Sequence, residues 1–297
     1  MPAAYEQLLD ATISHLEHLR AAGVRFLTIS PEALAALRGP TAATPPKPPA
    51  RTPSIVAPSR PAMPAEKPVI PSSATPAPPS AALPGPPLDP VAKAAAMHEL
   101  REQALACVKC PNLANARAHV VFGVGSIDAE LMFVGEAPGA DEDQQGEPFV
   151  GAAGQLLTRI IQTMGLSRET VYIANILKCR PDTPGQPTGN RKPTPAEMQT
   201  CIPYLHSQID LIRPKALVAL GATAIEGLLG QVGGVNRVRG KWHTYRGIPL
   251  MPTFHPAYLL RNQALTEKRK VWEDMLQVMH HLGMPISDKQ RGFFLPK

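Results

Sequence analysis

The chain is organised around the stretch GEAPGADEDQQGEPFVG, from Gly135 to Gly151. It follows an apolar run at 131–134 that is typical of a buried strand. It precedes residues 152–164, where apolar residues recur at helical spacing. Glycines let backbone amides approach a ligand closely, but the carboxylates here would repel a phosphate. The loop suits a neutral ligand or a cation beside the flat ring of Phe149; a solvated acidic loop is the alternative.

Strands and helices alternate on both sides of this loop. Three further apolar runs predict strands, and helical patterns lie between them: the strands are 171–176, 216–220 and 249–254, and the helices 93–107, 195–212, 222–229 and 266–282. This alternation predicts a parallel sheet covered by helices on both faces. Because ligands of such sheets bind outside the carboxyl ends of the strands, we expect functional residues directly after each strand.

The globular pattern covers residues 93–283 and is followed by a C-terminal tail at 284–297. Residues 1–39 have the apolar spacing of a small helical module, which is too short to bury much core alone. We expect it to be a docking arm without chemistry of its own. Residues 40–92 are rich in Pro and Ala and offer too little apolar surface to offset the entropy of ordering, which predicts a disordered linker.

Composition narrows the class of protein. The chain has 297 residues and a formal net charge of +6, which is compatible with a polyanionic partner. No apolar run reaches the roughly 18 residues of a membrane span, and the N-terminus lacks the pattern of a secretory signal. We expect a cytoplasmic, nucleoid-associated monomer, in which four cysteines indicate metal binding or catalysis rather than disulfides.

Polar and aromatic side chains gather after the predicted strands. Glu136, Glu142 and Phe149 follow the first strand, Asn175 ends the second, and His255 follows the fourth. Each has a plainer explanation when taken alone: the asparagine as a turn residue, the phenylalanine as core, the histidine as structural. Their shared position at one edge of the sheet favours a joint site.

These residue types suit the removal of a planar base. Phe149 can stack on the ring, and the Asn175 amide can pair with N3–H and O4 of uracil while rejecting cytosine, which presents the opposite pattern. His255 can donate to O2 as negative charge collects on the departing base. A carboxylate such as Glu142 can position water and stabilise the sugar, since glycosidic cleavage passes through an oxocarbenium-like state.

Four cysteines form a second candidate site in the globular part: Cys107, Cys110, Cys179 and Cys201. Four thiolates hold zinc or an iron–sulfur cluster, and the spacing does not separate the two. Four unrelated buried thiols are the alternative. A shared site would tie the helix at 93–107 to the loop after the second strand, which favours a structural role over a redox role.

Three motifs together resemble the family 4 uracil-DNA glycosylases, the iron–sulfur members of the uracil glycosylase superfamily. They are residues 135–157, NILKCRP from Asn175 to Pro181, and HPAYLLR from His255 to Arg261. The resemblance runs from about Met97 to Leu282. It implies a three-layer α/β/α sandwich around a four-stranded parallel sheet, and a [4Fe-4S] cluster on the four cysteines. The implied reaction hydrolyses the N-glycosidic bond of deoxyuridine in DNA, releasing uracil and leaving an abasic site.

The resemblance also implies roles for single residues. Phe149 would stack on uracil, Asn175 would read its edge and His255 would stabilise the uracil anion. Glu142 is the implied carboxylate for water, Glu136 is a second catalytic candidate, and Ala137 would line the pocket. The candidate DNA contacts are Leu259, Leu260, Arg261, Arg239 and Lys241, where a leucine would enter the stack as a wedge.

Two other functions stay open, a covalent trap and an inactive DNA-binding protein. A sister branch of the family traps its product with a histidine in a basic loop and a GEQPG motif. This chain has GEAPG, and its loop at 189–194 has no histidine, which favours turnover. The four site residues Glu142, Phe149, Asn175 and His255 favour an enzyme over an inactive binder. We expect the N-terminal module to recruit a repair or replication protein.

Overall fold

The computed structural model describes residues 88–183, 186–230 and 234–295. The expected N-terminal module at 1–39 and nearly all of the expected linker at 40–92 lie outside the described residues. Within the described part, no helix has both the length and the apolar character needed to cross a membrane.

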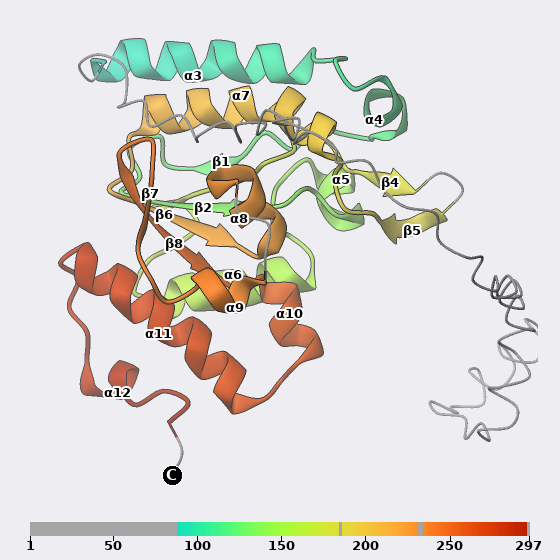
Figure 1. The fold of residues 1–297 in the computed structure, drawn as a ribbon. Coiled ribbons are helices and arrows are strands. Elements are labelled where there is room, and N and C mark those ends of the chain that lie inside the picture. The colour runs from blue at the N-terminus through green and yellow to red at the C-terminus, as the bar shows by residue number, and fades with distance from the viewer. Residues whose placement is uncertain (1–87, 184–185, 231–233, 296–297) are drawn as a thin grey trace, which may run out of the picture. The chain divides into compact units, whose positions relative to one another are not determined.

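A six-stranded sheet with the order β1-β3-β2-β6-β8-β7 forms the middle layer (Figure 1). Its four central strands are parallel: β3 (Tyr172–Asn175), β2 (Leu131–Gly135), β6 (Ala216–Leu220) and β8 (Ile248–Thr253). Two short strands, β1 (Val124–Gly125) and β7 (His243–Tyr245), pair antiparallel with the edges. The expected four-stranded parallel sheet is confirmed, and the two antiparallel edge strands extend it.

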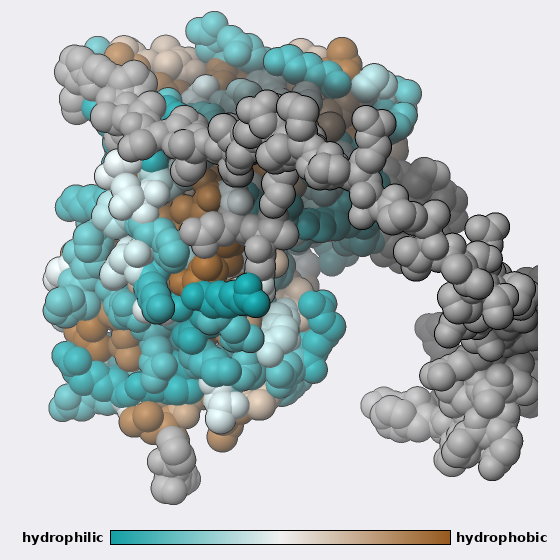
Figure 2. Space-filling view, viewed as in Figure 1, coloured by the Kyte–Doolittle hydropathy of each residue, from teal (hydrophilic) through white to brown (hydrophobic). Residues whose placement is uncertain are grey.

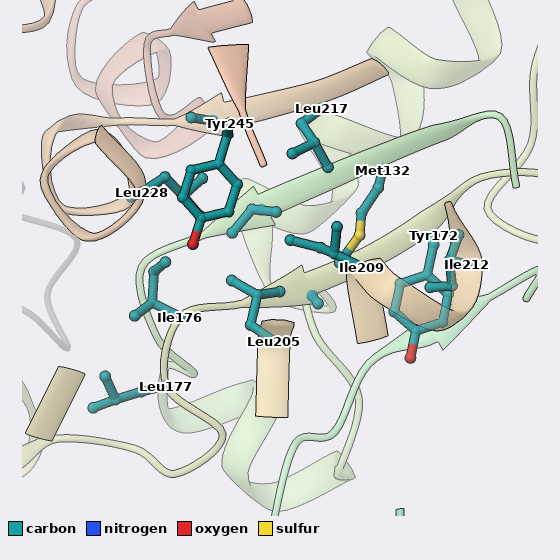
Figure 3. Close-up of a cluster of buried hydrophobic side chains, with 14 of the residues drawn as sticks. Met132, Tyr172, Ile176, Leu177, Leu205, Ile209, Ile212, Leu217, Leu228 and Tyr245 are labelled. Carbon is teal, nitrogen blue, oxygen red and sulfur yellow. The ribbon is translucent and has the colours of Figure 1, made fainter. Parts of the chain in front are cut away.

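The central strands are mostly apolar because helices cover both of their faces, and polar residues such as Asn175 stand at their carboxyl ends. Every residue of β2, β3 and β6 is buried. Alternate side chains point to opposite faces, so Met132 packs into one core cluster and Phe133 into the other. Figure 3 shows Leu205 and Ile209 of the helix at 195–212 beside Met132.

Helices form the outer two layers, as expected. One layer holds α3 (Pro90–Leu105), α7 (Pro195–Ile212) and α8 (Ala222–Leu229), and the other holds α6 (Ala152–Thr163) and α11 (Leu265–His281) (Figure 1). On the face seen in Figure 2, hydrophobic side chains gather near α8, whereas hydrophilic ones dominate over α11. The three-layer α/β/α architecture is therefore confirmed.

Helix boundaries agree closely with the pattern, apart from the first helix. Helices α7 and α8 have the predicted bounds. Helix α3 begins three residues before the predicted start at 93, because the Asp89 carboxylate caps it by accepting the N–H groups of Val91 and Ala92 at 3.1 and 3.0 Å.

Several short elements were not predicted. They are the helices α4 (Pro111–Ala116), α5 (Ala140–Gln145), α9 (Val235–Val238), α10 (Pro256–Arg261) and α12 (Asp288–Arg291), and a hairpin of β4 (Asp182–Thr183) and β5 (Gln186–Asn190). Helix α5 lies inside the stretch that the sequence analysis treated as a loop. The described part of the C-terminal tail packs on the domain, since Trp272 Nε1 donates to the Gln290 carbonyl at 2.6 Å.

Candidate active site

A pocket of about 690 Å³ opens at the carboxyl ends of the parallel strands. Six of the predicted site residues line it: Glu136, Ala137, Glu142, Phe149, Asn175 and His255. The pocket also takes in Arg261 at its rim and, from the hairpin, Asn190 and the neighbouring Arg191, which the sequence analysis did not place in a pocket. The residues that were expected to gather at the carboxyl ends of the strands therefore share one pocket, and their roles stay predictions.

Gly135, the last residue of β2, lets two site residues meet. A Cβ atom at this position would lie 2.3 Å from Asn175 Oδ1 and 2.6 Å from Phe149 Cζ. The buried Phe149 ring also stacks near the His255 ring, with centroids 5.5 Å apart and planes inclined by 30°. The first glycine of the opening stretch is thus required by close approach of side chains.

Asn175 holds an unsatisfied acceptor inside the pocket. Its side chain is only 1% exposed, and Oδ1 has no hydrogen-bond partner among the described residues. A buried polar atom without a partner is costly, so native proteins keep few of them and mostly where a ligand or water completes the bond. The Asn175 amide is therefore arranged to accept a hydrogen bond from an N–H group.

His255 is presented as a neutral hydrogen-bond donor. It caps α10, and its Nδ1 accepts the N–H of Ala257 at 3.1 Å, so the ring proton of the neutral form lies on Nε2. Burial lowers the pKa of His255 to about 4, and the charge of Arg261 adds to this, whereas Glu142 opposes it. The ring is therefore uncharged near neutral pH.

The two carboxylates of the pocket have different surroundings. Glu142 accepts three backbone N–H groups, from Gly139 at 3.0 Å, Val150 at 2.9 Å and Gly151 at 3.0 Å. A carboxylate has about four acceptor positions, so most of those on Glu142 are occupied. The carboxylate of Glu136 has no hydrogen-bond partner in the part of the chain that the structure describes. The sequence predicted both acids as site residues but not this contrast in their hydrogen bonding.

Lys178 contacts the pocket with its side chain, and its charge also partly offsets the rise that burial causes in the pKa of the Cys201 thiol. The side chain is 2% exposed, and Nζ donates to the Asn175 carbonyl at 3.0 Å and to Gln208 Oε1 at 2.6 Å. Burial lowers the pKa of Lys178 to about 8. Gln208 in turn donates to the hydroxyl of Tyr172 at 2.9 Å. This buried network, which sequence reasoning missed, supports the strand end that carries Asn175.

The predicted DNA contacts have diverse environments. Leu259 is buried with Phe254 in a core cluster, whereas Leu260 is partly exposed, and Arg261 and Lys241 are exposed. Arg239 is bound to the fully buried Asp274, with Nη2 to Oδ1 at 2.7 Å and Nε to Oδ2 at 3.2 Å. Arg239 thus has a structural partner, and its contact with DNA stays a prediction.

The four predicted metal ligands, Cys107, Cys110, Cys179 and Cys201, line one small second pocket. Arg117 Nη1 donates to Cys179 Sγ at 3.1 Å, and the Lys178 N–H donates to Cys201 Sγ at 3.2 Å. Burial raises the pKa of Cys201 to about 11. Within the described residues, no group of three or more His, Cys, Asp or Glu side chains is drawn together as for a bound metal ion.

Comparison with known proteins shows close relatives. A model of the uracil DNA glycosylase superfamily matches residues 122–276. The type-4 uracil-DNA glycosylase of Thermotoga maritima is 44% identical over 183 residues, which are 60% of this chain and 91% of that protein. That of Sulfurisphaera tokodaii is 39% identical over 209 residues, 67% and 90% of the two chains. A type-5 uracil-DNA glycosylase of Pyrobaculum aerophilum is 27% identical over 185 residues, 52% and 79% of the two chains.

Proposed function

The chain belongs to the uracil DNA glycosylase superfamily, and we propose how its pocket removes uracil from DNA. The protein is a DNA repair enzyme that hydrolyses the N-glycosidic bond of deoxyuridine, releases uracil and leaves an abasic site. The observation that carries the proposed mechanism is the buried Oδ1 of Asn175, which lies beside the ring of Phe149 and has no hydrogen-bond partner within the described part of the chain.

Asn175 and Phe149 recognise the base. A flipped uracil stacks on Phe149, and its N3–H donates to Asn175 Oδ1 while O4 accepts from the same amide. Cytosine carries an acceptor at N3 and an amino donor at C4, so both pairings would fail. Leaving buried polar groups unpaired costs about 1–3 kcal/mol each, which is enough for strong discrimination. The hydrogen bond from Lys178 Nζ to the Asn175 carbonyl holds the backbone of Asn175, and with it the amide that recognises the base.

His255 stabilises the leaving group. As the bond from C1′ to N1 breaks, the bonding electrons go to the base, and negative charge collects on O2. The Nε2–H of neutral His255 donates to that oxygen. A neutral imidazole needs no proton transfer to do this, because it offers a fixed donor whose tautomer is set by the Ala257 N–H.

The two carboxylates act on the sugar and the water. We propose that Glu142, held by three N–H groups, supplies fixed negative charge facing the cationic sugar. Glu136 has its carboxylate available to orient the attacking water. The water oxygen bonds to C1′, its proton passes to the carboxylate, and the uracil anion takes a proton from solvent. This division shifts water handling from Glu142, the residue that the sequence resemblance implied, to Glu136.

The four cysteines would hold a [4Fe-4S] cluster. In support, all four line one pocket, and two N–H groups donate to their sulfurs, which is a usual feature of cluster ligands. When bound, the cluster would cross-link the segment after α3, the loop after β3 and helix α7. A brown protein with broad visible absorbance is expected; a colourless protein carrying zinc would contradict the assignment.

DNA would enter along the rim of the pocket. Arg261 and Lys241 are exposed and suited to phosphate contacts, and Leu260, the less buried of the two leucines, is the better wedge. We also propose that residues 1–39 serve as a recruiting arm on the linker at 40–92. The composition of those segments supports this role.

A strand-scission assay tests the function. The purified full-length protein is incubated with oligonucleotides that differ only in one base, uracil, cytosine or thymine, and then treated with alkali. We expect scission at uracil alone. No scission of the uracil strand would contradict the enzyme, and a shifted band that survives denaturation would show covalent trapping instead.

A further inference from the structure

The guanidinium of Arg168 holds the backbone of the pocket loop. Arg168 lies in the turn between α6 and β3, outside every motif of the sequence, and is partly buried. Its Nη2 donates to the Pro148 carbonyl at 2.7 Å and its Nη1 to the Phe149 carbonyl at 3.0 Å. A longer contact of 3.5 Å joins Nη1 to Thr158 Oγ1. A planar fork bound to two consecutive carbonyls fixes the orientation of both peptide groups.

Phe149 needs such a restraint because its backbone is strained. Its φ angle is 56°, in the left-handed region that bulky side chains rarely adopt. Such conformations persist where the surroundings hold them, and they cluster at functional sites. Without the restraint, Phe149 would relax towards an extended backbone. Its ring would then leave the place beside Asn175 and His255.

The backbone directly after Phe149 is also restrained by hydrogen bonds. Glu142 accepts the N–H groups of Val150 and Gly151, directly after Phe149. Gly154 in the first turn of α6 packs so closely that a Cβ atom there would lie 1.9 Å from the Phe149 carbonyl oxygen. Arg168 therefore holds the carbonyl groups of this turn, and Glu142 holds the amides that follow.

We propose that Arg168 is a positioning residue for uracil excision, which keeps the Phe149 ring in the plane on which the base stacks. The inference rests on the proposed stacking role of Phe149. Arg168 acts on the reaction through that ring, since its Nη1 and Nη2 donate to the loop backbone and Thr158. Its removal therefore weakens excision only while the ring is present.

A double-mutant cycle tests this dependence. The four full-length proteins are wild type, Arg168→Met, Phe149→Ala and the double variant. Each is assayed for single-turnover excision from a uracil oligonucleotide and for inhibition by free uracil. We expect either single change to slow excision on the order of tenfold and to weaken inhibition by uracil, as loss of a base-stacking contact predicts. The double variant should be no slower than Phe149→Ala.

Two further variants separate positioning from general stability. Arg168→Lys keeps the charge but not the fork, so it should lose part of the excision rate and part of the uracil inhibition. Arg246→Met is the matched control, because Arg246 is also a partly buried arginine and has a bidentate partner, Asp210 at 2.7 and 2.8 Å, but it does not line the pocket. It should lower thermal stability and leave inhibition by uracil unchanged.

Each outcome decides the inference. If Phe149→Ala excises uracil at the wild-type rate, the stacking role fails and the inference fails with it. If Phe149→Ala is slow but Arg168→Met is not, or if Arg168→Met slows excision equally with and without the ring, stacking stands and the role of Arg168 is overturned. Should Arg168→Met not fold, Arg168→Lys is compared in the same two backgrounds and decides by the same criteria.

Discussion

Acidification tests whether the pocket keeps His255 neutral. Burial, together with the charge of Arg261, lowers the pKa of His255 to about 4. At about pH 5.5, a ring with this pKa is about 3% protonated, whereas a histidine with the unperturbed pKa of about 6.5 is about 90% protonated. We therefore expect His255 to stay neutral with its proton on Nε2, and to contribute to the excision rate, down to about pH 5.5.

The same shift makes stability depend on pH. The folded-state pKa of His255 lies below the unfolded-state value, so the unfolded chain takes up the proton first. Stability present above about pH 6.5 is then lost as the pH falls towards about 4. The difference between the two pKa values corresponds to about 3 kcal/mol of unfolding free energy, of which about 2 kcal/mol is lost by about pH 5. His255→Asn can still cap α10 but does not titrate, so it should lack this loss.

Two measurements check the prediction. Nitrogen NMR of labelled histidine reports the tautomer and protonation of the ring, and denaturant unfolding of wild type and His255→Asn near pH 7 and pH 5 reports the stability difference. A ring that titrates near its ordinary pKa, or equal acid sensitivity of the two proteins, would refute the reasoning. Arg261→Gln should raise the pKa of His255, because a positive charge is removed.

Five further changes have defined outcomes. Glu136→Gln should slow single-turnover excision on the order of a hundredfold with little effect on thermal stability. Glu142→Gln should slow excision and also lower the thermal stability, because its amide NH₂ would face backbone N–H donors. Equal thermal midpoints of Glu136→Gln and Glu142→Gln would contradict the proposed division of roles. Lys178→Met should lower the unfolding free energy by about 2–4 kcal/mol, since the Asn175 carbonyl loses a buried partner, and an unchanged denaturation midpoint would count against that network. Deletion of residues 1–87 should leave excision from an oligonucleotide unchanged, and a large loss of rate would show that the arm takes part in catalysis. Removal of iron by a chelator should bleach the visible absorbance and lower the melting temperature, and a melting temperature that does not move would argue against a structural cluster.

The sequence predicted the sheet well because the central strands carry a strong signal. Strands buried on both faces read as continuous apolar runs, and β6, α7 and α8 have their predicted bounds. The edge strands β1 and β7 have two and three residues, too few for any periodicity. Helix α5 was missed because its six residues, ADEDQQ, have no apolar face.

The order of strands along the chain predicted which residues would gather at one edge of the sheet. The strand-end rule brought together Glu136, Phe149, Asn175 and His255, which all line the pocket. The support of these residues could not be predicted, since the Arg168 contacts join segments 19 and 20 residues apart without a local pattern. Residue type alone also could not distinguish buried from exposed members of the HPAYLLR motif.

A crystal structure of the protein with free uracil would show whether Asn175 recognises the base. We expect N3 of uracil to lie about 2.8–3.0 Å from Asn175 Oδ1, the ring to stack on Phe149, and O2 to face Nε2 of His255. Uracil bound elsewhere, or bound in the pocket with Asn175 Oδ1 still unpaired or occupied by water, would contradict the account.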